Sequence, residues 1–204
     1  MLPPRACATP ARQALAGLLL AALLAIPALR DWLQASMWRH MLLQFPLWLL
    51  TGALLAAALP PRLRGGIARF NAHGIAGLVA LGVVLSVLMM PRVLDLALRD
   101  AGIEVAKCMA LLLAGGLLRL SWRAAGMVVQ AFFLGMQLPM MVVVGQLYVD
   151  SPLRLCNAYL QDDQIRLGHW LIGLAALVGI AWLAHVAWQL IRREDGRLTD
   201  ATPQ

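Results

Sequence analysis

The sequence is poor in charge. Asp, Glu, Lys and Arg make up only 13% of its 204 residues, whereas 61% are hydrophobic and the mean hydropathy is +0.76. A soluble domain of this length needs far more polar surface than these residues supply. Linker-like stretches and the alternating ten-residue segments of a membrane β-barrel are also lacking. The composition therefore predicts an all-α, polytopic transmembrane helical bundle that forms a single integral membrane domain over residues 1–204.

Cysteine and the signatures of soluble enzymes are scarce as well. The three cysteines, Cys7, Cys108 and Cys156, are odd in number and lack CxxC spacing, so they predict neither a disulfide framework nor a zinc ribbon. No Walker A loop, GxGxxG, GxSxG or HExxH motif is present. We therefore expect a protein that is not an enzyme.

Apolar runs predict about six membrane spans, since a span needs about 20 apolar residues. The runs cover Ala14–Leu29, Met41–Leu59, Phe70–Met90, Glu104–Leu118, Ala124–Leu147 and Gly168–Ile191. Residues 1–30 form either an N-terminal anchor or a signal peptide cleaved after Ala28, which would leave five spans. We favour the anchor because no Ala-x-Ala precedes the boundary. Residues 31–192 then form the bundle and 193–204 a cytoplasmic tail.

The basic residues punctuate the apolar runs instead of forming a binding face, so the net charge of +7 sets topology and does not indicate nucleic acid. Six spans put ten basic residues on one side and seven on the other, where seven of the ten acidic residues also lie. The side richer in arginine is predicted to be cytoplasmic. The chain is thus expected in a bacterial inner membrane with both termini in the cytoplasm. The ten residues are Arg5, Arg12, Arg62, Arg64, Arg69, Arg119, Arg123, Arg192, Arg193 and Arg197.

The outer face carries the longer connections, so the functional site is expected there. The stretch Tyr148–Leu167 is predicted to form an interfacial helix and a polar turn, and PRVLDLALRD a short amphipathic helix. Glu104 and Lys107, one turn apart, are expected to form a local ion pair of little energetic value if exposed. Gly115 and its neighbour Gly116 are expected to serve helix contact.

The second apolar run begins with a stripe of soft metal ligands. Met37, His40, Met41 and Gln44 follow the i, i+3, i+4, i+7 spacing of one helical face. Thioether and imidazole groups suit Cu(I), so copper is the expected cofactor. The same spacing is also that of ordinary helix packing, and methionine commonly fills irregular cores.

His169 begins the last run, beside Gly168, which lets another backbone or a flat cofactor approach closely. We predict that His169 and His40 share one metal site, with Asp163 and Gln164 orienting the imidazole. The alternative is an interfacial histidine that caps a polar helix start.

Haem b is the alternative cofactor. His40 with His169, and His73 with His185, would then be axial pairs of a transmembrane electron carrier. On one helix His169 and His185 are roughly 24 Å apart, a suitable haem separation, but they differ in direction by about 160°. One straight helix cannot aim both side chains at a shared bundle interior, and His73 also fits an interfacial position.

Several stretches resemble the CtaG-type cytochrome c oxidase assembly factors, a family of which this chain would be a divergent member. SMWRHMLLQFPLWLLTGALL resembles the second-helix motif, through Met37, His40, Met41, Pro46 and Gly52. HGIAGLVALGVVLSVLMMPRVLDLAL, GLLRLSW and DDQIRLGHWLIG are similar to later motifs, the last through Asp163, Gln164 and Gly168. The likeness spans most of residues 36–175. Ser36, Met89 or Met90, and Lys107 stand where the family has histidines, and His169 replaces a glycine.

The resemblance implies support of respiratory oxidase maturation, plausibly by copper handling at the periplasmic face, without catalysis. The expected partners are membrane lipid and a respiratory oxidase subunit or another membrane redox partner. Two hypotheses remain beside it, the di-haem electron carrier and a structural or partner-binding membrane subunit whose histidines are interfacial.

Overall fold

The structure, a computed structural model, describes residues 9–200 and is all-α over that range; the side chains of residues 193 and 195–200 are not described. The helical elements are α1 (Pro10–Ala25), α2 (Pro27–Gln34), α3 (Met37–Arg39), η1 (His40–Gln44), α4 (Phe45–Leu55), η2 (Ala56–Ala58), α5 (Pro61–Phe70), α6 (Ile75–Leu88), α7 (Pro91–Arg99), α8 (Ala101–Trp122), α9 (Met127–Asp150) and α10 (Gln161–Asp200). The predicted fold class is confirmed.

Four helical stretches are long and apolar enough to cross a membrane: Met37–Ala58, Ala101–Trp122, Met127–Asp150 and Gln161–Arg192. Two further pairs, α1 with α2 and α6 with α5, meet the same test only when each bent pair is counted as one span. Large apolar side chains are exposed along these helices, as on a surface that faces lipid. The chain is therefore a candidate multi-pass membrane protein with four to six spans.

Both bends occur where the sequence cannot continue a helix. The first is 73° and falls before Pro27, at the start of α2. The second is 86° and separates α6 from α5, a helix that lies mostly between two of the predicted apolar runs. Gly74 sits in this turn with φ +71°, and a Cβ there would be 2.4 Å from the backbone oxygen of Ser121. Only glycine fits both the torsion and the close approach.

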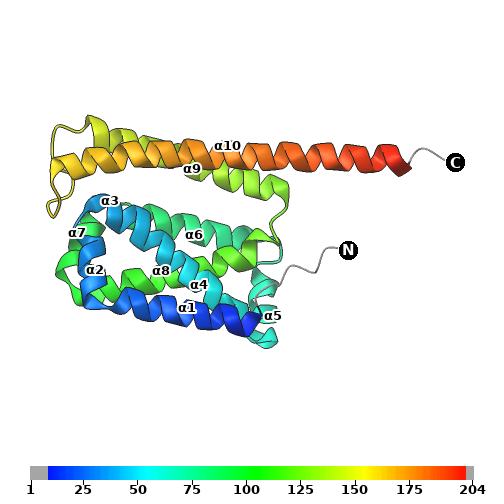
Figure 1. Cartoon of the computed structure of the whole chain (residues 1–204), viewed down its shortest axis with the longest axis horizontal. Helices are drawn as coiled ribbons and strands as arrows, with labels where there is room; N and C mark the ends of the chain where they lie inside the picture. Colours follow the sequence, from blue (N-terminus) through cyan, green and yellow to red (C-terminus); the bar gives the residue numbers. More distant parts are fainter. Residues whose placement is uncertain (1–8, 201–204) are drawn as a thin grey trace.

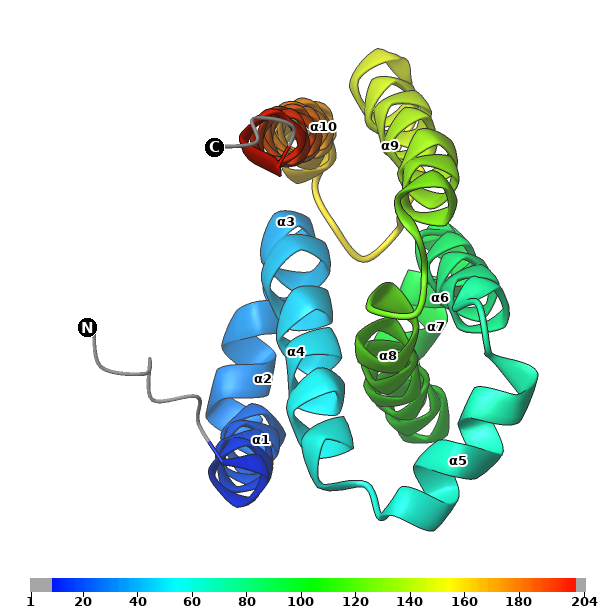
Figure 2. The same ribbon diagram turned by 90° about the vertical axis from the view of Figure 1, so that its right-hand side faces the viewer.

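Helices α4 and α8 pack at the centre, with α1 against α4 and α6 against α8. Helices α9 and α10 form a hairpin that lies to one side of this group, as Figures 1 and 2 show. The α10 helix also contacts α3 at the end of the bundle that was predicted to be outer. It continues through residues 193–200, where a tail was expected; residues 1–8 of the N-terminal segment and 201–204 of the tail lie outside the described range.

Glycines allow the closest helix contacts. A Cβ on Gly52 of α4 would lie 1.9 Å from the backbone oxygen of Leu112, and one on Gly115 of α8 would lie 1.9 Å from that of Leu49. The predicted role of Gly115 in helix contact is thus confirmed. In the hairpin, a Cβ on Gly168 would lie 2.5 Å from the backbone oxygen of Gly145, so the close partner of Gly168 is a backbone.

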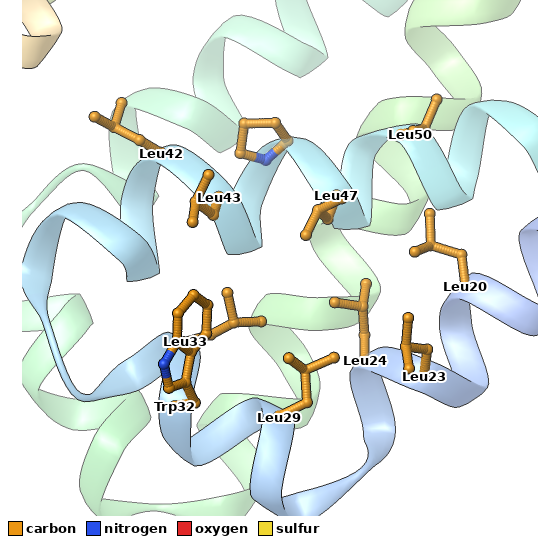
Figure 3. A pocket seen from close by; sticks show the side chains of 11 residues that line it. Leu20, Leu23, Leu24, Leu29, Trp32, Leu33, Leu42, Leu43, Leu47 and Leu50 are labelled. Atoms are coloured by element: carbon orange, nitrogen blue, oxygen red, sulfur yellow. The ribbon is translucent and has the colours of Figure 1, made fainter.

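A cleft of 420 Å³ lies inside the bend between α1 and α2, facing α4. Figure 3 shows its leucine side chains, such as Leu24, Leu33 and Leu47, together with Trp32 at one edge. The walls carry no ionisable group, so this cleft offers no chemistry beyond apolar contact.

Candidate functional site

A π-helical turn places His40 and Gln44 near the N-terminal end of the candidate span Met37–Ala58. This turn, η1, ends two residues before Pro46, which has no N–H to donate to the preceding turn. A single π-turn is a common way to absorb such a shift in register and occurs frequently at functional sites. The His40 side chain is 0% exposed and Gln44 is 1% exposed, so both point into the bundle.

The ammonium group of Lys107, on α8, lies between three hydrogen-bond acceptors. Its Nζ lies 2.6 Å from His40 Nε2, 3.2 Å from Gln44 Oε1 and 2.6 Å from Glu104 Oε2. The predicted ion pair with Glu104 is confirmed, but it is buried, with side-chain exposures of 1% for the lysine and 11% for the glutamate. Buried charges persist in a bundle only when they are paired and hydrogen-bonded.

The second oxygen of Glu104 is held from two sides. Gln34 Nε2 in α2 donates to Glu104 Oε1 over 2.7 Å, and Cys108 Sγ approaches the same oxygen at 3.7 Å. The bent pair of α1 and α2 thus contributes directly to the site, because Gln34 of α2 reaches Glu104 at the N-terminal end of α8.

The hydrogen bonds fix the tautomer of His40. An ammonium group only donates, so Lys107 makes His40 Nε2 an acceptor. The proton of the neutral ring is then on Nδ1, which donates to the hydroxyl oxygen of Tyr159 over 2.7 Å. His40 also lies edge-on to Phe45, with ring centroids 5.6 Å apart. Both ring nitrogens are therefore engaged.

Tyr159 belongs to residues 151–160, which contain no helix although an interfacial helix was expected around them. Asp95 of α7, the confirmed amphipathic helix, organises this loop. Its carboxylate accepts hydrogen bonds from Cys156 Sγ (2.9 Å) and from the backbone N–H groups of Asn157 (2.9 Å) and Ala158 (3.1 Å). The loop's hydrogen-bonding groups are satisfied by this carboxylate instead of by a helix.

The same contacts shift two ionisations outside the spans. Burial raises the pKa of Asp95, but the hydrogen bonds from Cys156, Asn157 and Ala158 outweigh it and hold the pKa below its ordinary value. Burial, followed by the hydrogen bond to Asp95 and its negative charge, raises the pKa of the Cys156 thiol to about 12. The pair is therefore carboxylate and neutral thiol at neutral pH.

The predicted metal ligands fall in two environments. His40, Met37 and Met41 are buried, whereas His169 is exposed on α10. Asp163 accepts a hydrogen bond from Ser36 Oγ over 3.0 Å. This bond joins the start of α10 to the residue before Met37.

Gln164, the other predicted supporting residue, is 1% exposed and braces the loop that carries Tyr159. Its Oε1 accepts from the backbone N–H of Leu155, and its Nε2 donates to the backbone oxygen of Tyr148. Gln164 thus supports His40 indirectly, through the position of Tyr159. The joint site of His40 and His169 stays a prediction.

The haem alternative also stays a prediction. His73 and His185 are exposed, and His185 Nε2 lies 2.8 Å from Gln189 Nε2 on the same helix. No ring contact among the described residues joins two histidines. Within those residues there is also no group of three or more His, Cys, Asp or Glu side chains suited to a metal ion.

Comparison with known protein families, curated proteins and solved structures found no match to this chain.

Sequence reasoning missed the centre of the network. Lys107 is the only lysine in a chain with sixteen arginines, which was the available signal that its side chain has a special place. Arginine serves as well as lysine for topology, so a single lysine inside a span is better explained by a site that needs a compact ammonium. Tyr159 gave no comparable signal.

The arrangement is chemically a site for a cation. A neutral imidazole nitrogen, an amide oxygen and a carboxylate oxygen converge on one point, which the ammonium of Lys107 occupies. Two thioethers, Met37 and Met41, lie on the segment that carries His40, and Cys108 follows Lys107.

Proposed function

We propose that this chain is an accessory membrane protein that supports maturation of a respiratory haem–copper oxidase and handles copper as cargo at the outer face. The resemblance to the CtaG-type factors supports a role in oxidase maturation, and the set of donor atoms supports the binding of copper. The observation that carries the proposal is the convergence of His40 Nε2, Gln44 Oε1 and Glu104 Oε2 on a single buried cation, Lys107 Nζ.

The donor chemistry fits Cu(I). His40 supplies a neutral nitrogen, and Met37, Met41 and Cys108 supply sulfur close to it in the chain, a combination that suits this soft ion. Lys107 then acts as an internal cation that holds the site closed until the metal displaces it. His169, exposed on α10, would take part in an outer contact with metal or partner, and Asp163 and Gln164 would hold the surrounding segments.

Competition for Cu(I) with a chromophoric chelator, under anaerobic conditions, tests this proposal. The wild type is expected to take up about one Cu(I) per chain, and Lys107→Gln to bind it about tenfold more tightly, since the competing ammonium is gone and the Glu104 carboxylate then balances the charge of the metal. His40→Ala should lose the metal. Met136→Leu, an exposed methionine on α9, is the matched control and should behave as the wild type.

Absence of Cu(I) from both the wild type and Lys107→Gln would overturn copper handling. The same outcome would favour a second candidate, a partner-binding membrane subunit. One observation supports that candidate directly: both ring nitrogens of His40 are already hydrogen-bonded, as in a purely structural network. A Soret band in the purified protein would instead favour the haem b carrier.

A further inference from the structure

A second and larger cavity lies at the opposite, arginine-rich end of the bundle. It encloses 1160 Å³ between the central helices α4, α6 and α8 and the α9–α10 hairpin. Near the outer end α10 contacts α3, whereas α4 runs away from α10 toward the arginine-rich end, as Figure 2 shows. The cavity is thus an open groove between two packed units, which we call the inner groove.

The inner groove is amphipathic along its length. Its walls are mainly apolar, with Leu85 from α6, Phe133 from α9 and Val178 from α10. Its end is basic and aromatic, and is formed by Arg64, Arg119, Arg123 and Trp122. No acidic residue lines it. An apolar trough that ends in clustered positive charge matches a molecule with a hydrocarbon body and an anionic head.

The arginines are oriented by the protein without being neutralised by it. Arg119 Nη1 donates to the backbone oxygen of Ala53 over 3.2 Å, and Arg64 Nη2 donates to the last carbonyls of the second span. Neither arginine, nor the exposed Arg123, belongs to the ion pairs found among the described residues. A guanidinium has five N–H donors, so the carbonyl contacts leave others for a phosphate.

We propose that the inner groove binds one anionic phospholipid, with its acyl chains along the apolar walls and its phosphate between Arg119 and Arg123. Within a bilayer the walls alone give no preference, because hydrocarbon tails surround every helix equally. Selectivity must come from the headgroup, and basic pockets between spans on the cytoplasmic side are suited to acidic lipids. Trp122 lies at the same depth, where indole rings favour the headgroup region.

Lipid is a better match than a partner helix or a free phosphate. A transmembrane partner helix would bury its apolar surface along the walls but would bring no group that requires three arginines. A free phosphate would use the arginines but leave the long apolar walls without a role. Only the amphiphilic anion accounts for both halves of the groove.

Native mass spectrometry of the delipidated full-length protein tests the proposal. The protein is titrated with phosphatidylglycerol and, separately, with phosphatidylcholine of the same acyl chains. We expect phosphatidylglycerol to bind about tenfold more tightly at one site. Arg123→Gln is the headgroup variant, and Val178→Phe narrows the groove. Arg69→Gln, an exposed arginine of α5 outside the lining, is the matched control.

Loss of the preference for phosphatidylglycerol in Arg123→Gln, while Arg69→Gln retains it, would support the headgroup site. Weaker binding of both lipids in Val178→Phe would show that the lipid lies in the inner groove. Equal binding of the two lipids by the wild type would overturn the proposal, since it would indicate general contact with the lipid annulus. A tightly bound molecule other than a phospholipid, displaced by neither lipid, would overturn it too. The comparison of the two lipids on the wild-type protein tests the proposal even if a variant does not fold.

Discussion

Lys107 Nζ lies 2.6 Å from His40 Nε2, so the only lysine of the chain ends on the ring nitrogen that a metal ion would use. The contact links α8 to the π-turn before α4, and these two helices pack closely through Gly52 and Gly115. It therefore joins the chemistry of the site to the packing of the bundle. Whatever changes the charge of Lys107 must also change how these two helices meet.

The first prediction concerns the buried pair of Lys107 and Glu104. Lys107→Met should destabilise the protein by about 3–5 kcal/mol, because it leaves the Glu104 carboxylate buried without a cation. Glu104→Gln/Lys107→Met should cost clearly less than the single variant, because no charge is left behind. Unfolding in detergent, followed by circular dichroism, measures both.

The surface pair Arg30–Asp31 supplies the control for that comparison. Its side chains are 45% and 68% exposed, and its atoms are 3.4 Å apart. Arg30→Gln should change stability by about 0–1 kcal/mol, because water screens an exposed pair. A Lys107→Met variant that is no less stable than Arg30→Gln would show that the pair of Lys107 and Glu104 is not buried as described.

The second prediction uses the fact that the chain has a single lysine, so that side-chain amine labelling reports on Lys107 alone. An amine-reactive ester should label Lys107 poorly in the folded protein, since the ammonium is buried and surrounded by acceptors. Labelling should rise about tenfold in Glu104→Gln, which removes the negative charge that holds the ammonium in place. Peptide mapping separates Lys107 from the amino terminus. Rapid labelling of the folded wild type would contradict this arrangement.

Periodicity and composition predicted the helical elements better than the site. The apolar runs, the amphipathic α7 and the pairing of Lys107 with Glu104 all depend on short-range spacing, which a sequence displays directly. The burial of that pair depends on the rotation of α8 within the bundle, which spacing does not encode.

The contact of Tyr159 with His40 joins residues 119 positions apart and depends on a loop held by Asp95. The polar residues around Tyr159 suggested an interfacial helix, but the side chain of Asp95 provides hydrogen bonds that replace helical ones. Tertiary contacts of this kind leave no local pattern, so they were not predictable from the sequence.

A third prediction follows from Cys156. With a pKa of about 12, its thiolate fraction at pH 8 is on the order of 10⁻⁴, against about 0.2 for an ordinary thiol, so alkylation should be slow. The rate should increase about tenfold per pH unit from pH 8 to 10, without levelling off, because deprotonation still limits it there. Iodoacetamide labelling of a Cys7→Ser/Cys108→Ser background measures Cys156 alone.

Asp95→Asn in the same background should speed the labelling, since it removes the negative charge that opposes the thiolate and weakens the contacts that bury the loop. Asp100→Asn, which alters a carboxylate at the neighbouring start of α8, is the control and should leave the rate unchanged. A rate that reaches half of its plateau value near pH 8.5 in this background would mean that Cys156 is an ordinary exposed thiol.

The last prediction tests the packing that supports the site. Gly52→Ala should destabilise the protein strongly, because its Cβ would fall 1.9 Å from the backbone oxygen of Leu112 and force α4 away from α8. We expect a loss of about 1–3 kcal/mol or more, as for overpacking of a close contact.

Gly65→Ala is the control. Nothing lies within 4 Å of a Cβ at that position of α5, so the substitution should stabilise the helix by about 0.5–1 kcal/mol through lower chain entropy. The contact between His40 and Lys107 joins η1, which leads directly into α4, to α8. Gly52→Ala should therefore also increase amine labelling of Lys107, whereas Gly65→Ala should not. Unchanged labelling in a destabilised Gly52→Ala protein would show that the site and the helix contact are independent.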